Sequence, residues 1–181
     1  MSAAFDTTTL LIAIAPAERV NTSVGGVIIP DAKARVDHLI ATLEKSKQRL
    51  IIPVPALAEA LVSVDPTVGG RFVERMSKTS SVFLAPFDVL EAMEASAMAA
   101  EALRGGDKRG GATGDYQKVK VDRQIVAIAK FHGASVIYSN DKDVRTLGKR
   151  EGITVIGVEE LPLPAKLVQP PLLERMNGDD K

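Results

Sequence analysis

Short apolar segments alternate with stretches of helical periodicity along the whole chain. Five of these segments have the length and the apolar content of buried strands. They cover residues 3–5, 49–52, 81–84, 134–138 and 153–156. Strands that alternate with helices are typical of an α/β protein. We therefore expect a central, mostly parallel sheet of about five strands.

Apolar residues between the strands recur at the spacing of helices. Pro16 ends the first helix, Asp31 is a candidate N-cap of the second, and Gly133 ends the sixth. The stretch 104–117 contains five glycines and almost no apolar residue, so we expect a mobile surface loop there. The predicted helices span residues 7–15, a segment after Asp31, 55–64, 68–76, 88–103, 119–131 and 142–150.

The chain of 181 residues is long enough for one domain with a substantial core. We place this domain at residues 1–160. Residues 161–181 contain four of the ten prolines, so we expect an irregular C-terminal tail. The longest early apolar run, residues 10–15, is too short to span a membrane and follows no basic residue. We expect a cytoplasmic protein without a membrane segment.

Composition narrows the chemistry that the chain can perform. The sequence has no cysteine and only two histidines, which excludes thiolate nucleophiles and Cys-based zinc sites. Lysine and arginine (23) balance aspartate and glutamate (23), so there is no global positive charge that would attract nucleic acid. Carboxylates remain abundant, and they suit hard cations such as Mg²⁺ and Mn²⁺.

Several carboxylates stand at strand ends or in the first turns of helices. Asp6 follows the first strand, and Asp141 and Asp143 follow the fourth. Asp122 shares a helical face with apolar residues, and Glu59 is the only charge in residues 54–64. Helix capping or a solvated first turn also accounts for each acid taken singly. Together, however, a parallel sheet could bring them to one edge, where ligand sites of open α/β sheets lie.

An acidic pocket of this kind requires a counter-charge. Two carboxylates about 4 Å apart repel each other by roughly 4 kcal/mol at an effective dielectric constant of about 20. A cluster of them therefore binds a cation or takes up protons. Mg²⁺ or Mn²⁺ in such a pocket can activate a water molecule and bind phosphate oxygens.

Basic residues near Asp122 suit a polyanionic substrate. A solvated helix face and a solubilising loop explain them equally well when each is taken alone. The candidates for binding such a substrate are Lys118, Lys120 and Arg123 in the helix, and Arg104 and Arg109 in the loop before it. That this substrate is RNA is implied by the family resemblance described next.

Four segments in order resemble the motifs of the PIN-domain family of nucleases, which includes toxins of toxin–antitoxin pairs. They are Phe5-Asp6-Thr7-Thr8-Thr9-Leu10-Leu11, the stretch Ile52–Glu59, the helix Val121–Ala129, and Val136–Asp143. The resemblance covers residues 3–158 and implies a three-layer α/β/α fold. Thr8 stands where the opening motif often has Asn, and the chain is longer than the compact toxins.

The resemblance also implies a function and a site. It implies an endoribonuclease that depends on Mg²⁺ or Mn²⁺, is usually a homodimer, and in the toxins has an antitoxin partner. Its catalytic residues would be Asp6, Glu59, Asp122 and Asp141, which would also bind the metal. Asp143 would be a further ligand, and Ser139, Thr8 and Asn140 would support the site.

Two other classes of protein are alternatives to a nuclease. An aspartyl-phosphate phosphatase needs a second Asp two residues after the first, where this chain has Thr8. A binding protein or scaffold that acts through a partner or through RNA is the remaining alternative. Clustered carboxylates destabilise a fold because they lose hydration and repel each other. A binding protein has no physical reason to keep a complete set of them, so the sequence favours the nuclease.

Overall fold

The computed structural model describes residues 2–15, 23–24 and 27–168. Its centre is a five-stranded sheet with the order β5-β4-β1-β6-β7, and every neighbouring pair is parallel. The strands are β1 (Ser2–Phe5), β4 (Arg49–Pro53), β5 (Val82–Ala85), β6 (Ala134–Tyr138) and β7 (Thr154–Ile156). All five strands predicted from the sequence are therefore present, and they form one sheet.

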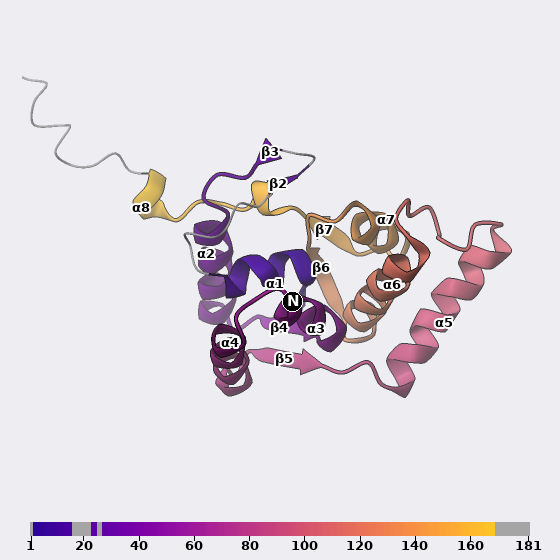
Figure 1. Ribbon diagram of the computed structural model, residues 1–181, viewed down its shortest axis with the longest axis horizontal. Coiled ribbons are helices and arrows are strands. Elements are labelled where there is room, and N and C mark those ends of the chain that lie inside the picture. Colours follow the sequence, from indigo (N-terminus) through magenta and orange to yellow (C-terminus); the bar gives the residue numbers. More distant parts are fainter. Residues whose placement is uncertain (1, 16–22, 25–26, 169–181) are drawn as a thin grey trace, which may run out of the picture.

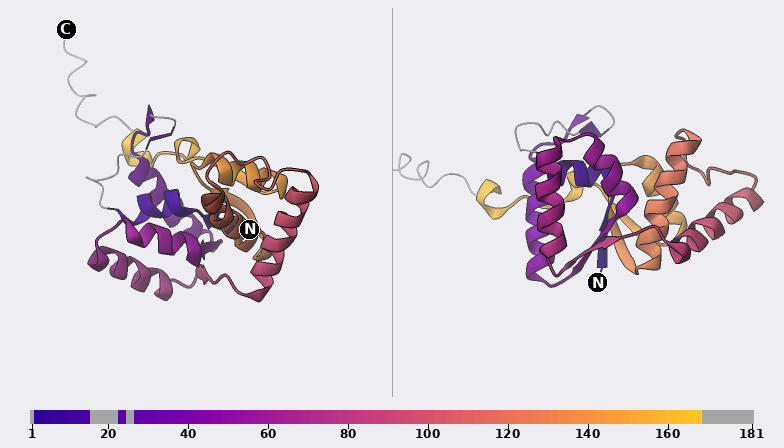
Figure 2. Two further views of the ribbon diagram at one scale, coloured as in Figure 1. Left: turned by 45° about the vertical axis from the view of Figure 1, so that its right-hand side comes forward. Right: turned by 60° about the horizontal axis from the view of Figure 1, so that its bottom comes forward.

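Helices cover both faces of the sheet and make three layers (Figures 1 and 2). The first face carries α1 (Thr7–Ile14), α2 (Ala32–Lys45), α3 (Val54–Val62) and α4 (Pro66–Lys78). The second carries α5 (Val89–Arg104), α6 (Tyr116–Phe131) and α7 (Lys142–Arg150). The predicted α/β/α architecture is confirmed.

The period-two alternation of strand residues builds a separate core on each face. In β1, Phe5 lies in the core beneath α1–α4, whereas Ala4 lies in the core beneath α5–α7. In β4, Ile52 lies in the core beneath α1–α4 and Ile51 lies in the core beneath α5–α7. After their first residues, Ser2 and Arg49, both strands are buried and apolar, as is typical of a central parallel sheet.

The order of the strands determines where a ligand site can lie. The chain passes from β1 outward through β4 to β5, then crosses to β6 on the other side of β1 and continues to β7. The order therefore reverses beside β1. In open α/β sheets, ligands bind at such a reversal, outside the carboxyl ends of the strands. Asp6 and Ser139 directly follow the two strands that meet there, β1 and β6.

Three predictions of local structure need correction. A short hairpin of β2 (Ser23–Val24) and β3 (Val27–Ile28) lies between the first two helices, where the apolar pattern predicted no strand. Asp31 precedes α2 as expected, but it has a left-handed backbone and its side chain caps nothing. Helix α6 begins at Tyr116, three residues early, because the side chain of Asp115 accepts a hydrogen bond from the N–H of Gln117.

The first part of the segment after β7 packs against the first helix layer. It forms a 3₁₀ turn, η2 (Val158–Glu160), and later a short helix, α8 (Ala165–Val168). Leu161 is buried in the core, and its carbonyl accepts a hydrogen bond from Arg35 of α2. The predicted tail therefore begins as part of the packed domain, and its residues 169–181 lie outside the described part of the chain.

Candidate metal centre

The carboxyl ends of β1 and β6 place Asp6 beside Ser139. Phe5 and Tyr138, the last residues of these strands, are partners in the parallel register. Ser139 is fully buried, and its hydroxyl donates a hydrogen bond to Asp6 Oδ2. The same hydroxyl accepts one from the N–H of Asp141, at 2.9 Å. Ser139 thus links the acid after β1 to the turn that precedes α7.

Asp6 is held entirely by neutral donors. It is the N-cap of α1, and its Oδ1 accepts the N–H of Thr9 at 2.8 Å. The Thr8 hydroxyl lies 2.9 Å from both carboxylate oxygens. Burial raises the pKa of Asp6, and the hydrogen bonds from Ser139, Thr9 and Thr8 only partly oppose it. The predicted capping role is confirmed, and the carboxylate has a fixed orientation.

A second set of carboxylates lies between α6 and α7. Asp122 is on α6, Asp141 is the N-cap of α7, and Asp143 is in the first turn of α7. One oxygen of each lies within 4.8 Å of the others. We call these three residues the acidic trio. At this separation each ionised pair is disfavoured by about 3–4 kcal/mol at an effective dielectric constant of about 20.

Lys118 supplies positive charge to the trio. Its ammonium lies 2.8 Å from Asp122 Oδ2, 2.7 Å from Asp141 Oδ2 and 3.7 Å from Asp143 Oδ2. Lys118 and Asp122 are one helical turn apart on α6, so the helix itself brings them together. Sequence reasoning placed Lys118 on an RNA-binding rim, whereas the structure places it among the acids.

The pKa values of the trio reflect burial and this ammonium. Burial raises the pKa of Asp122 to about 6, because the attraction of Lys118 does not fully compensate for lost hydration. Burial also raises the pKa of Asp141, but hydrogen bonds from Lys118 and from the N–H of Asp143 outweigh it. The net pKa of Asp141 is therefore below its ordinary value.

The glycine-rich segment before α6 is attached to the trio. The N–H groups of Thr113 and Gly114 donate to the two oxygens of Asp143, at 2.7 and 3.0 Å. A Cβ at position 114 would stand 2.4 Å from Asp143 Oδ2, so a close approach of this kind requires glycine. The expected surface loop therefore contacts the site, through backbone groups that residue-type patterns do not reveal.

Glu59 and Asn140 lie at the margin of the site. Glu59 is exposed on α3, and its Oε2 accepts a hydrogen bond from Thr7 Oγ1 at 2.6 Å. It therefore lies next to the Asp6 turn and is not part of the trio. The Asn140 N–H donates to Thr8 Oγ1, and its Oδ1 accepts the N–H of Val158 at 2.7 Å. Thr8 and Asn140 thus tie the loops after β1, β6 and β7 together.

The basic residues differ in their surroundings. Arg123 is only 4% exposed, and its guanidinium donates to the carbonyl of Lys108. This burial is incompatible with the predicted place of Arg123 on an exposed RNA-binding rim. Lys120 is exposed and lies 4.8 Å from the Tyr116 ring centroid, and Lys108 lies 4.6 Å from it. Arg104 and Arg109 are also exposed.

The trio has the donor set that a divalent cation requires. All its side-chain donors are carboxylate oxygens, the ligand type that Mg²⁺ and Mn²⁺ prefer. The Lys118 ammonium already occupies a position within reach of all three residues, so the site accommodates a positive charge. Asp122, Asp141 and Asp143 are the residues that could hold the ion, with Asp6 adjacent through Ser139.

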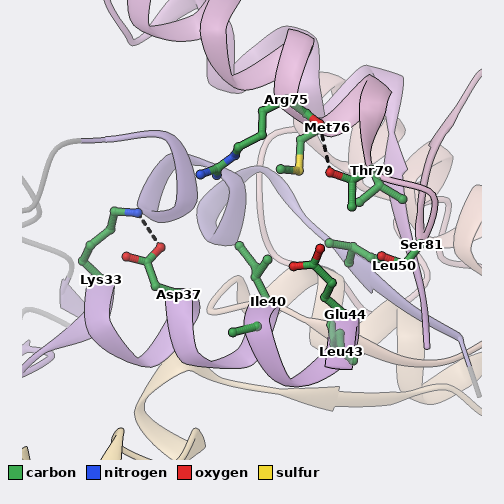
Figure 3. Close-up of a pocket in the computed structure, with 12 residues that line it drawn as sticks. Lys33, Asp37, Ile40, Leu43, Glu44, Leu50, Arg75, Met76, Thr79 and Ser81 are labelled. Carbon is green, nitrogen blue, oxygen red and sulfur yellow. Dashed lines mark hydrogen bonds and ion pairs between the residues drawn. The ribbon is translucent and has the colours of Figure 1, made fainter. Parts of the chain in front are cut away.

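A hollow lies at the opposite end of the strands from the trio, between α2 and α4 (Figure 3). It is lined by Ile40, Leu50 and Met76, and it is bordered by the Lys33–Asp37 ion pair and by Arg75. Leu50 lies near the amino end of β4. The charges along this hollow are mixed, and it contains no cluster of acids comparable with the trio.

Within residues 2–15, 23–24 and 27–168, the structure contains no helix that is both long and apolar enough to cross a membrane. The sequence matches no protein-family model and no curated protein at a significant level.

Solved structures show what kind of fold this is. One similar chain belongs to VapBC2 from Rickettsia felis, with a TM-score of 0.55 and 14% identity. That structure is bound to a DNA fragment from the VapBC2 promoter. A chain of DNA-bound VapBC from Salmonella typhimurium is similar with a TM-score of 0.54 and 17% identity. Each likeness covers 87% of this chain and 98% of the other. The chain therefore has a PIN-like three-layer fold, as its motifs predict.

Proposed function

We propose that the chain is a divalent-metal-dependent endoribonuclease that hydrolyses phosphodiester bonds in RNA. The observation that carries this proposal is the acidic trio, which lies beside the strand-order reversal of a PIN-like fold and already binds a cationic group. The order of the four sequence motifs supports the choice of RNA and of the toxin role in a toxin–antitoxin pair.

In this proposal Asp122, Asp141 and Asp143 hold Mg²⁺ or Mn²⁺. Bound there, the ion would supply positive charge for phosphate oxygens and lower the pKa of a water molecule. Asp6 orients Ser139, whose hydroxyl in turn positions the N–H of Asp141. Glu59 acts at the margin of the site, where it is exposed to substrate and hydrogen-bonded to Thr7.

Exposed basic groups would bind the backbone of the RNA. Lys120 and Lys108 flank the start of α6 beside Tyr116, and Arg104 and Arg109 belong to the segment that leads into it. Charges of this kind act on the phosphate backbone and not on base sequence. The proposal therefore assigns them to affinity, whereas specificity depends on the shape of the RNA.

Partner proteins belong to the same proposal. The structural neighbours are VapBC complexes bound to DNA, which supports an antitoxin partner for this chain. Helix α5 exposes several large apolar side chains, a composition typical of protein interfaces. These side chains support a homodimer; they are Val89, Leu90, Met93 and Leu103.

Cleavage of labelled single-stranded RNA in Mg²⁺ or Mn²⁺ tests the function. We expect Asp122→Asn and Asp141→Asn to reduce the cleavage rate at least about 100-fold, because even residues that only orient metal ligands contribute 10- to 100-fold. Asp37→Asn is the matched control, since Asp37 is exposed on α2 and pairs with Lys33 far from the trio. It should retain the wild-type rate.

Three outcomes would contradict the proposal. Equal rates for the wild type and both trio variants would assign the cleavage to a contaminating nuclease. Binding of RNA without cleavage, in a protein whose melting temperature is unaffected by Mn²⁺, would favour the scaffold instead. A DNA strand of the same sequence tests the substrate, and cleavage of DNA alone would overturn the choice of RNA.

A further inference from the structure

Lys118 differs from the three acids that it contacts in its exposure to solvent. Its side chain is 45% exposed, whereas Asp122 and Asp143, which it contacts, are buried. The ammonium is attached through a flexible four-carbon stem, so it can leave the trio without a change in the backbone of α6. Asp6, by comparison, accepts hydrogen bonds from a backbone N–H of α1 and from the buried hydroxyl of Ser139.

The charge of Lys118 is poorly matched to the trio. A single positive charge faces three carboxylates, whereas a divalent ion would balance more of their charge. Burial lowers the pKa of Lys118, but the hydrogen bonds to Asp122 and Asp141 outweigh this effect and raise it above its ordinary value. The ammonium donates hydrogen bonds to Asp122 Oδ2 and Asp141 Oδ2, and it cannot share these oxygens with a metal ion.

We propose that Lys118 is a tethered cation that occupies the metal position in the metal-free protein and that a divalent ion must displace. The inference rests on the metal site of the proposed function and assigns a competing role to a residue of the same site. Lys118 keeps the trio assembled without metal, and for this reason it weakens metal binding. A residue that merely supports the site would have the opposite effect, since its loss would weaken metal binding.

Calorimetric titration with Mn²⁺ alone distinguishes these two roles. We expect Lys118→Met to bind Mn²⁺ at least tenfold more tightly than the wild type, because no charge-assisted hydrogen bonds have to be broken. Lys118→Arg keeps a cation at this position and should bind Mn²⁺ no more tightly than the wild type. Lys120→Met is the matched control, since Lys120 lies on the same helix outside the trio, and its affinity should not change.

A measurement on the wild-type protein keeps the inference testable if Lys118→Met fails to fold. The side-chain NMR signal of Lys118 should shift during titration with Mg²⁺, with the same midpoint as Mg²⁺ binding measured by calorimetry. The signal of Lys120 should stay in place.

These experiments distinguish failure of the competing role of Lys118 from failure of the proposed function. Unchanged or weaker Mn²⁺ affinity in Lys118→Met would overturn the competing role of Lys118 and leave the metal site intact. A Lys118 signal that stays in place while Mg²⁺ binds would do the same. The absence of Mn²⁺ binding in the wild type and in both Lys118 variants would instead overturn the proposed function itself.

Discussion

Asp6 and the acidic trio show two ways of keeping carboxylates near the centre of a fold. Asp6 accepts hydrogen bonds from two hydroxyls and a backbone N–H, all neutral and located in the first turn of α1 or directly after β6. Asp141 and Asp143 of the trio also accept backbone N–H groups, but the positive charge that faces all three acids comes from Lys118. Neutral donors fix an orientation, whereas an ammonium neutralises charge and can be exchanged for another cation. The difference supports the proposed division of roles, in which Asp6 organises the site and the trio holds the ion.

Removing Asp6 is expected to have the largest effect on stability. Asp6→Ala leaves the N–H of Thr9 and the hydroxyl of Ser139 without their buried acceptor. We expect a loss of about 2–4 kcal/mol in the free energy of unfolding, measured by urea denaturation. Asp6→Asn should lose less, since the amide oxygen still accepts the N–H of Thr9.

A matched control separates this network from ordinary helix capping. Asp65 is the exposed N-cap of α4 and accepts hydrogen bonds from the N–H groups of Thr67 and Val68. Asp65→Ala should lose only about 1 kcal/mol. If Asp6→Ala lost no more than this, Asp6 would be an ordinary cap and the contrast with the trio would disappear.

The pH dependence of metal binding probes the trio. The pKa of Asp122 in the metal-free protein is about 6, so a proton competes with the metal below this pH. Asp122 is largely ionised at pH 7 and largely protonated at pH 5. We therefore expect the dissociation constant for Mn²⁺ to rise roughly tenfold between pH 7 and pH 5, measured by calorimetry.

Circular dichroism at both pH values is the control that the protein remains folded. A dissociation constant that does not change over this range would mean that Asp122 is no ligand, and the metal would then have to be bound by other acids.

The smallest expected effect concerns Asp143, which combines both kinds of contact. It lies near Lys118, and its two oxygens also accept the N–H groups of Thr113 and Gly114. Gly114→Ala would push a methyl group against Asp143 Oδ2, and we expect a loss of about 1 kcal/mol in thermal or urea unfolding.

Gly70→Ala is its matched control. Gly70 lies inside α4 with open space around it, so an alanine should stabilise the helix by up to about 1 kcal/mol. Equal stability changes in the two variants would show that the segment around Gly114 does not hold Asp143.

Most of the fold could be predicted because its signals are local. Apolar runs of strand length and helical periodicity identified all five strands of the sheet and the seven helices on its two faces. The hairpin β2–β3 was missed because each of its strands has only two residues, too few for a periodic pattern. Helix α6 was predicted too short because its cap, Asp115, lies in a glycine-rich stretch.

The sequence by itself determined which residue types follow β1 and β6, and it therefore determined that acids gather at one edge of the sheet. Only the tertiary structure decided which charged residues lie together, which stay exposed and which are buried. It put Lys118 among Asp122, Asp141 and Asp143, left Glu59 exposed, and buried Arg123. The physical reason is that strand and helix patterns depend on neighbours a few residues away. The surroundings of a charge depend instead on segments such as α6 and the β6–α7 turn, which meet only when the chain has folded.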